Sequence, residues 1–174
     1  MNRLLYLTLL LTAHCLTPSP AMAEPGAHVH GIAKLQVAVD GDTLTLDFES
    51  PLDNLLGFEH MPHSEKQIAA VRAMAERLNK PGNLFLPTPA ASCTVLSTKL
   101  ESPVLAPAKK ANGDGHADLD AEFIFKCAQP GELRGLEVRL FDAFPNLRRL
   151  DVQVAGARGQ SAAKLTPTQR RISW

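Results

Sequence analysis

The sequence has no excess of charge of either sign. It contains 18 Lys and Arg residues and 18 Asp and Glu residues among 174 residues in total. Nucleic acids and anionic membranes are held by a strongly basic field, which a chain of this composition does not supply. Beyond the first 23 residues there is also no apolar run long enough to span a bilayer. We therefore expect no nucleic-acid partner and no membrane-embedded segment in the mature chain.

The sequence also lacks the short motifs of common hydrolases. It has no G-x-S-x-G and no H-E-x-x-H. Cysteine is scarce, and outside the N-terminal segment only Cys93 and Cys127 occur. In an oxidising compartment an even pair of cysteines indicates a disulfide, which is favoured here over two zinc-ligating thiols. With no free thiol and no hydrolase motif, the expected protein is not an enzyme.

The N-terminus has the pattern of a secretory signal. Arg3 precedes the apolar run LLYLTLLLTA, and Ala21-Met22-Ala23 fits the small-x-small cleavage pattern. The prediction is a cleaved signal peptide over residues 1–23 and one periplasmic domain over residues 24–174. About 150 residues are enough for one domain with a sizeable core.

Alternating apolar residues predict a sheet. Residues 32–50 contain two alternating runs around Asp40-Gly41, a strong signal for a β-hairpin with a two-residue loop. This loop would place Lys34 opposite Asp47. Further strands are predicted at 92–101, 116–128, 133–141, 147–156 and in the C-terminal tail. If the first two of these pair, Cys93 and Cys127 meet.

One helix is predicted. Residues 64–80 repeat apolar positions at helical spacing, with Ser64 as the N-cap and Gln67 completing a capping box. The predicted fold class is therefore α+β (mainly β). It consists of an antiparallel sheet built from hairpins, one long amphipathic helix packed on it, and one disulfide.

Histidines near the two ends of the first hairpin suggest a metal site. His28 and His30 are two residues apart, so on a strand they share one face, with Cα atoms about 6.5–7 Å apart. The connector after the hairpin carries Glu59 and His60 within chain reach. Imidazole and carboxylate groups are common zinc ligands. The candidate site is His28, His30 and His60, with Glu59 or a water in the fourth position. Alternatively, these histidines are polar residues at the start of a strand and a helix.

A second group lies in the stretch HADLDAE. His116, Asp118, Asp120 and Glu122 project from one face of the predicted strand and could bind a hard cation or add ligands to zinc. The alternative is a solvated strand face, which is favoured for Asp120 and Glu122. His116 is kept as a candidate metal ligand.

Long stretches of the chain resemble a known family. AHVHGIAKLQVAVDGDTLTLDFESPLDNLLGFEHMP, AEFIFKC, LRGLEVRLFDAFPNLRRLDVQ and GQSAAKLTPTQRRISW are similar to the ZrgA-type family of periplasmic zinc-uptake-related proteins of Gram-negative bacteria. The resemblance implies that the protein binds Zn²⁺ as cargo and assists its uptake by a zinc ABC-type system. Carried over to this chain, the HxHG motif gives His28 and His30, the FEH motif gives His60, and the start of the later strand gives His116. Family members often carry a long insertion rich in His, Asp and Glu between the two strands that hold the cysteines. This chain has only PAKKANGDGH at that place.

The expected function is therefore periplasmic zinc binding in support of uptake. Two other hypotheses remain: a structural or protein-interaction domain without a metal, and a zinc hydrolase with Glu59 as general base beside an enclosed pocket. Imidazole sites also take copper and nickel, so the identity of the metal is left open. The sequence does not indicate an oligomeric state.

Overall fold

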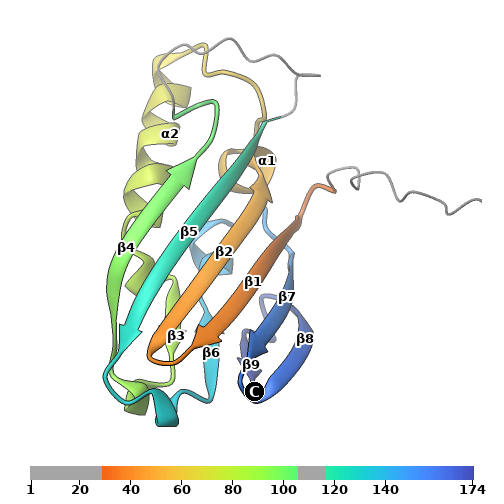
Figure 1. Ribbon diagram of the computed structural model, residues 1–174. Coiled ribbons are helices and arrows are strands. Elements are labelled where there is room, and N and C mark those ends of the chain that lie inside the picture. The colour runs from red at the N-terminus through yellow and green to blue at the C-terminus, as the bar shows by residue number, and fades with distance from the viewer. Residues whose placement is uncertain (1–28, 106–116) are drawn as a thin grey trace, which may run out of the picture.

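A computed structural model describes residues 29–105 and 117–174, which form two β-sheets and three α-helices (Figure 1). The larger sheet has the order β4-β5-β2-β1-β7-β8, and the smaller sheet has the order β3-β6-β9. The strands are β1 (Ile32–Asp40), β2 (Thr43–Pro51), β3 (Phe85–Pro87), β4 (Cys93–Glu101), β5 (Asp118–Cys127), β6 (Gly135–Val138), β7 (Arg149–Gly156), β8 (Gly159–Leu165) and β9 (Arg171–Ser173). The helices are α1 (Leu52–Leu56), α2 (Glu65–Leu78) and α3 (Leu140–Ala143).

The predicted signal peptide lies outside the described residues. Within the two described ranges, no helix is long and apolar enough to cross a membrane.

One face of the larger sheet forms the core. Strands β1 and β2 bury alternate side chains, among them Leu35, Leu46 and Phe48, because successive residues of a strand point to opposite faces. Helix α2 and the smaller sheet lie on this same side of the larger sheet (Figure 1). The helix adds its own buried stripe, with Met74 and Leu78 in the core. Burying one such side chain fully stabilises the fold by about 1.5–3 kcal/mol.

The predicted fold class is confirmed, and so is the start of the long helix. The Ser64 hydroxyl accepts a hydrogen bond from the backbone N–H of Gln67. The Gln67 side chain in turn accepts from the backbone N–H of His63, one residue earlier than in a standard capping box.

The first hairpin forms where expected, but its register is different. Val37 lies opposite Leu46, and Lys34 lies opposite Glu49 rather than Asp47. The loop is Gly41-Asp42, because Gly41 has φ +56° and occupies the first central position, where positive φ favours glycine. The shift is two residues, so every side chain keeps the face that the alternation predicted.

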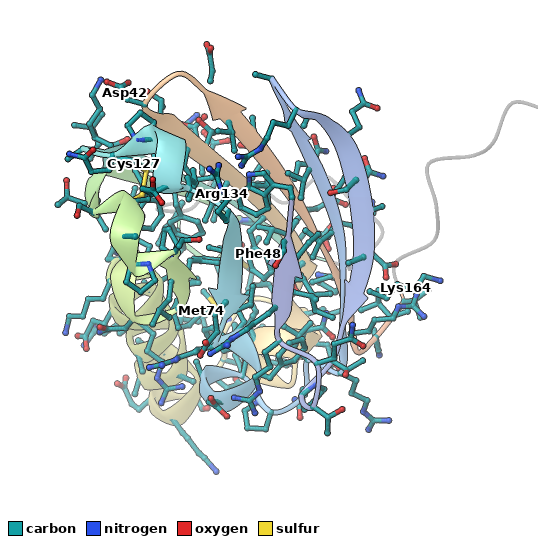
Figure 2. The ribbon with its side chains drawn as sticks, turned by 90° about the horizontal axis from the view of Figure 1, so that it is seen from below. Asp42, Phe48, Met74, Cys127, Arg134 and Lys164 are labelled. Atoms are coloured by element: carbon teal, nitrogen blue, oxygen red, sulfur yellow. A yellow bond between two sulfur atoms is a disulfide. The ribbon has the colours of Figure 1, made fainter. Side chains whose placement is uncertain are left out.

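The disulfide is confirmed. Cys93 and Cys127 lie opposite each other on β4 and β5 and are bonded (Figure 2). The cross-link holds β4, an edge strand of the larger sheet, to its neighbour. Both thiols are therefore consumed in the disulfide and are not available to bind a metal.

One strand pair of the larger sheet is parallel, which the sequence did not predict. Strand β7 lies beside β1 in parallel register, starting with Ile32 opposite Arg149. The chain between β5 and β7 forms β6, a strand of the smaller sheet, and α3, and then returns to the larger sheet as β7. The parallel pairing brings the start of β7 to the turn that contains His30.

Candidate functional site

The candidate site is built on the tight turn just before β1. The backbone N–H of Ile32 donates to the carbonyl of Val29 across this turn, and Gly31 has φ +83°. The Gly31 carbonyl accepts hydrogen bonds from the backbone N–H groups of Arg148 and Arg149 at 2.8 and 2.9 Å. A residue with a Cβ is strained at this φ, so glycine allows the chain to reverse here and present His30.

A buried asparagine fixes this turn from the other side. Asn54 is 1% exposed and lies in α1, directly after β2. Its Oδ1 accepts from the Gly31 N–H at 2.5 Å, and its Nδ2 donates to the Ile32 carbonyl at 2.9 Å. Nδ2 is also 3.1 Å from the hydroxyl of Ser50, which is fully buried. The turn is therefore held between β7 and α1, and the backbone of His30 is fixed with it.

His30 lies between two carboxylates. Its Nε2 is 3.1 Å from Oε1 of Glu59, and its Nδ1 is 3.7 Å from Oδ2 of Asp53. The Glu59 side chain is 11% exposed, whereas that of His30 is 59% exposed. The site is thus open on the histidine side and closed on the glutamate side. The predicted proximity of His30 and Glu59 agrees with this geometry.

These three groups do not form a complete metal site by themselves. In residues 29–105 and 117–174, no three His, Cys, Asp or Glu side chains are arranged to hold one metal ion. The reason is that the two carboxylates face opposite nitrogens of the His30 ring, and a metal bound by one nitrogen contacts only the carboxylate on that side. His30 Nε2 and Glu59 therefore supply two ligands, and Asp53 faces the opposite nitrogen of the ring.

The structure places His60 in a different set of contacts. Its ring stacks between Phe58 and His63, with centroid distances of 5.1 and 5.0 Å. Its Nδ1 is 2.8 Å from the carbonyl oxygen of Met61. Since a carbonyl oxygen can only accept, Nδ1 carries the proton, and the lone pair of the neutral ring is on Nε2. Metal-binding histidines commonly have one nitrogen oriented in this way.

His28 and His116 lie outside the described residues. His28 is two residues before His30 in the sequence. The residue after His116 is Ala117, whose carbonyl accepts from the backbone N–H of Leu52 at 3.0 Å, at the start of α1. Ala117 therefore lies at the same end of the larger sheet as the turn that carries His30.

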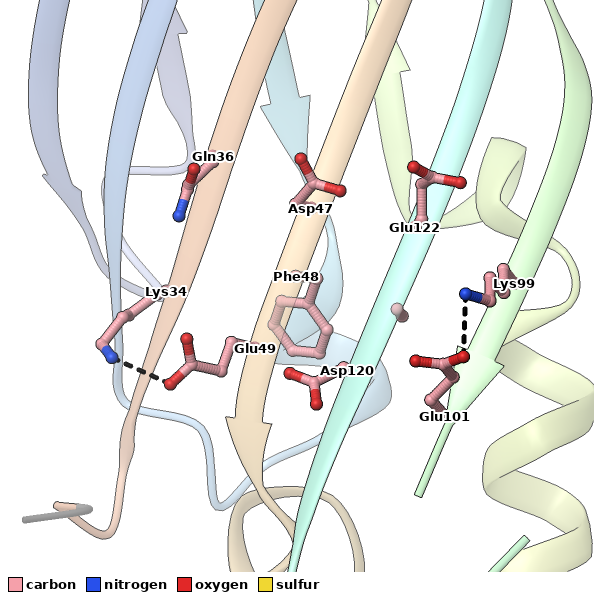
Figure 3. Close-up of a pocket in the computed structure, with 10 residues that line it drawn as sticks. Lys34, Gln36, Asp47, Phe48, Glu49, Lys99, Glu101, Asp120 and Glu122 are labelled. Atoms are coloured by element: carbon pink, nitrogen blue, oxygen red, sulfur yellow. Dashed lines mark hydrogen bonds and ion pairs between the residues drawn. The ribbon is translucent and has the colours of Figure 1, made fainter. Parts of the chain in front are cut away.

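Of the second predicted group, Asp120 and Glu122 lie on the open face of the larger sheet, and His116 is outside the described residues. A groove of about 330 Å³ crosses β1, β2, β5 and β4 there (Figure 3). Two ion pairs span neighbouring positions in it, Lys34 with Glu49 and Lys99 with Glu101, each at 2.8 Å. The Glu101 carboxylate raises the pKa of Lys99 above its ordinary value, first by hydrogen bonding and then by charge. The carboxylates that line the groove are Asp47, Glu49, Glu101, Asp120 and Glu122. With two lysines against five carboxylates, the groove is acidic.

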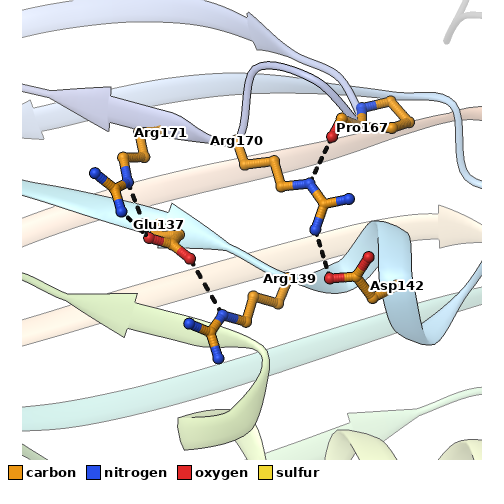
Figure 4. Close-up of polar contacts among 6 residues, drawn as sticks. All are labelled: Glu137, Arg139, Asp142, Pro167, Arg170 and Arg171. Atoms are coloured by element: carbon orange, nitrogen blue, oxygen red, sulfur yellow. Dashed lines mark hydrogen bonds and ion pairs between the residues drawn. The ribbon is translucent and has the colours of Figure 1, made fainter.

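A separate set of charges lies on the smaller sheet. The Glu137 carboxylate is paired with Arg171 at 2.6 Å and with Arg139 at 3.1 Å, and Asp142 is paired with Arg170 (Figure 4). Hydrogen bonds from Arg171 and then Arg139 hold the pKa of Glu137 below its ordinary value. These pairs connect β6, α3 and the C-terminal strand, and they contain no metal-binding histidine.

Two residues of the site were not singled out from the sequence. Asp53 and Asn54 lie in the connector, beside the histidine turn. Continuing the observed register of the first hairpin outward from Lys34 and Glu49 brings Asp53 opposite His30, so the hairpin was a usable signal for Asp53. Nothing in the sequence identifies Asn54 as the buried residue that binds the turn.

The comparison with protein families adds an independent finding. A sequence model described as "ZrgA family zinc uptake protein" matches residues 27–174, which is nearly all of the predicted mature chain. No curated protein matches the chain.

Proposed function

Because the chain belongs to the ZrgA family of zinc uptake proteins, we propose that it is a periplasmic accessory protein that captures Zn²⁺ through a histidine cluster. It passes this ion, as cargo, to a zinc ABC-type uptake system. The observation that carries the proposal is the 3.1 Å approach of His30 Nε2 to the largely buried carboxylate of Glu59. Imidazole nitrogen and carboxylate oxygen are both ordinary zinc ligands.

In the proposed site Zn²⁺ would lie between His30 Nε2 and Glu59 Oε1, which are 3.1 Å apart. The opposite nitrogen, Nδ1, then carries a proton and faces Asp53, whose carboxylate is 3.7 Å away. A carboxylate behind a metal-bound imidazole orients the ring and strengthens it as a ligand. His28 and His60 complete the tetrahedral set. His116 is the further candidate, since Ala117 adjoins the same end of the sheet.

The acidic groove supports capture. Its carboxylates lie on the open face of the same sheet (Figure 3). A cleft lined mainly by one sign of charge raises the local concentration of the opposite ion. The groove would therefore favour the approach of a divalent cation, and the histidines would supply the affinity.

The remaining features fit this function. A disulfide between Cys93 and Cys127 suits an oxidising compartment such as the periplasm. The half-exposed His30 is accessible to a partner that removes the ion, whereas a hydrolase requires an enclosed pocket beside the metal. The description of the family names uptake and not a reaction, so we propose a binding role without catalysis.

The test is zinc affinity of the mature, metal-stripped protein, measured by competition with a chromophoric chelator. We expect one ion per chain with a dissociation constant below about 1 μM, which is −8 kcal/mol or stronger. The His28→Ala/His30→Ala double variant and the Glu59→Gln variant should each weaken binding by at least about tenfold. Asp53→Asn should weaken it by about 10–100-fold, as for other groups behind a metal ligand.

Glu132→Gln is the matched control for Glu59→Gln, since it removes an exposed carboxylate that lies beyond the other end of β5 and contacts no proposed ligand. Its affinity should equal that of the wild type. If the wild type binds no ion below about 100 μM, or −5 to −6 kcal/mol, the alternative of an interaction domain without a metal replaces this proposal. Unchanged affinity in the double variant would show that the metal binds elsewhere.

A further inference from the structure

The two edges of the larger sheet differ in how they are protected. An edge strand exposes unpaired backbone groups, and proteins commonly protect such an edge with a bulge or with charged side chains. Strand β4 has both, since its register with β5 shifts between Val95 and Ser97, and it carries Lys99 and Glu101. Strand β8, at the opposite edge (Figure 1), has no register shift against β7 and carries one charge, Lys164.

The register with β7 decides which backbone groups of β8 face outward. The loop between the two strands has two residues, so Gly156 and Gly159 form a hydrogen-bonded pair. In an antiparallel ladder such pairs alternate with pairs that do not exchange hydrogen bonds. The N–H and C=O groups of Gln160, Ala162 and Lys164 therefore point away from β7. Within the described part of the chain, no hydrogen bond reaches these outward groups.

We propose that β8 is a dimerisation edge, which pairs antiparallel with β8 of a second copy about a two-fold axis at Ala162. In this register Ala162 lies opposite Ala162 of the second copy. Gln160 lies opposite Lys164 of the second copy, and the reverse pair follows by symmetry. The outward backbone groups of Gln160, Ala162 and Lys164 in each copy then all form hydrogen bonds with the other copy. Three residue pairs that exchange two bonds each give six backbone hydrogen bonds across the interface.

The side chains fit the same register. Gln160, Ala162 and Lys164 are exposed on the open face, so the Gln160 amide meets the Lys164 ammonium and no like charges face each other. On the other face Ser161 meets Ala163 of the second copy, and both side chains are small. Moving the second copy until Lys164 faces Lys164 would place two like charges opposite each other. It would also leave the outward backbone groups of Gln160 and Ala162 without a partner in β8 of the second copy, because that strand ends at Leu165. The edge is therefore self-complementary in one register.

The dimer would join two six-stranded sheets into one continuous sheet. The two-fold axis is perpendicular to the sheet, so the open faces of both copies lie on the same side. An interface of one strand pair is small, and interfaces of this size are typical of weak association.

Sedimentation equilibrium of the metal-stripped mature chain, with protein concentrations up to about 100 μM, tests the proposal. We expect a monomer–dimer equilibrium for the wild type. Ala162→Lys places two lysines opposite each other and should weaken the dimer by at least tenfold. Ala155→Lys is the matched control, because Ala155 is an exposed residue of β7 on the same face and adds the same charge one strand away from the edge. Its dimerisation should equal that of the wild type.

A second variant reports the register directly. Ala162→Cys should give a covalent dimer on mild oxidation, because the two residues face each other across the axis, and Ala155→Cys should not. Thermal melting confirms that each variant is folded. A wild type that remains monomeric throughout, or a dimer that Ala162→Lys leaves unchanged, would overturn the proposal.

Discussion

Replacing Asn54 with Ala tests whether this buried amide holds the histidine turn. The change removes three hydrogen bonds, to the Gly31 N–H, the Ile32 carbonyl and the Ser50 hydroxyl. Each bond contributes about 1 kcal/mol net, and a backbone group left buried without a partner costs more. We expect the free energy of unfolding to fall by about 3 kcal/mol. For a chain of this length the melting temperature should fall by roughly 10 °C.

The assay is urea denaturation of the metal-stripped protein, with Asn146→Ala as the matched control. Asn146 also donates through Nδ2 to a backbone carbonyl, that of Asp53 at 3.1 Å, but on the exposed surface. Its replacement should cost about 0.5 kcal/mol or less. Asn54→Ala should also weaken zinc binding, because His30 is no longer fixed between Asp53 and Glu59. If the two variants differ in stability by less than about 1 kcal/mol, the amide does not hold the turn.

Two further predictions concern the disulfide and the charges of the smaller sheet. The Cys93→Ala/Cys127→Ala variant should lose about 4 kcal/mol in urea denaturation, the chain-entropy value for a separation of 34 residues. A loss below about 1 kcal/mol would contradict that account. The folded pKa of Glu137 lies below its ordinary 4.5 because of Arg171 and Arg139. Its contribution to stability is therefore present above pH 4.5 and is lost as the pH falls through the lowered folded pKa. Glu137→Gln should make the urea midpoint fall less steeply below pH 4.5, and an unchanged slope would refute this.

Much of the fold follows from local patterns. The apolar alternation of residues 32–50 and 118–127 predicts strands and the faces they bury, since each side chain of a strand points opposite to its neighbour. The Ser64 cap and the helical spacing after it predict α2. The hairpin register was wrong by two residues because Gly41 has an aspartate on each side, Asp40 and Asp42, and either one can share the two-residue loop with it. Glycine favoured the first central position.

The candidate site was predicted in part. The sequence pointed to His30 and Glu59, and the structure brings them together. It also pointed to His60, which the structure places in a stack with Phe58 and His63. His28 and His116 stay predictions, as do all the ligand assignments.

The sequence by itself therefore determined most of the strands, the long helix, the cysteine pair and the family, because each depends on residues close together in the chain or on a motif read in order. It did not predict β3, and the strand predicted over 133–141 is β6 followed by α3. Only the tertiary structure decided that β7 pairs in parallel with β1, that Asn54 binds the turn, and that Asp53 and Glu59 lie on opposite sides of His30. These contacts join residues far apart in sequence. No local pattern fixes such contacts, because they depend on how separate elements pack around one core.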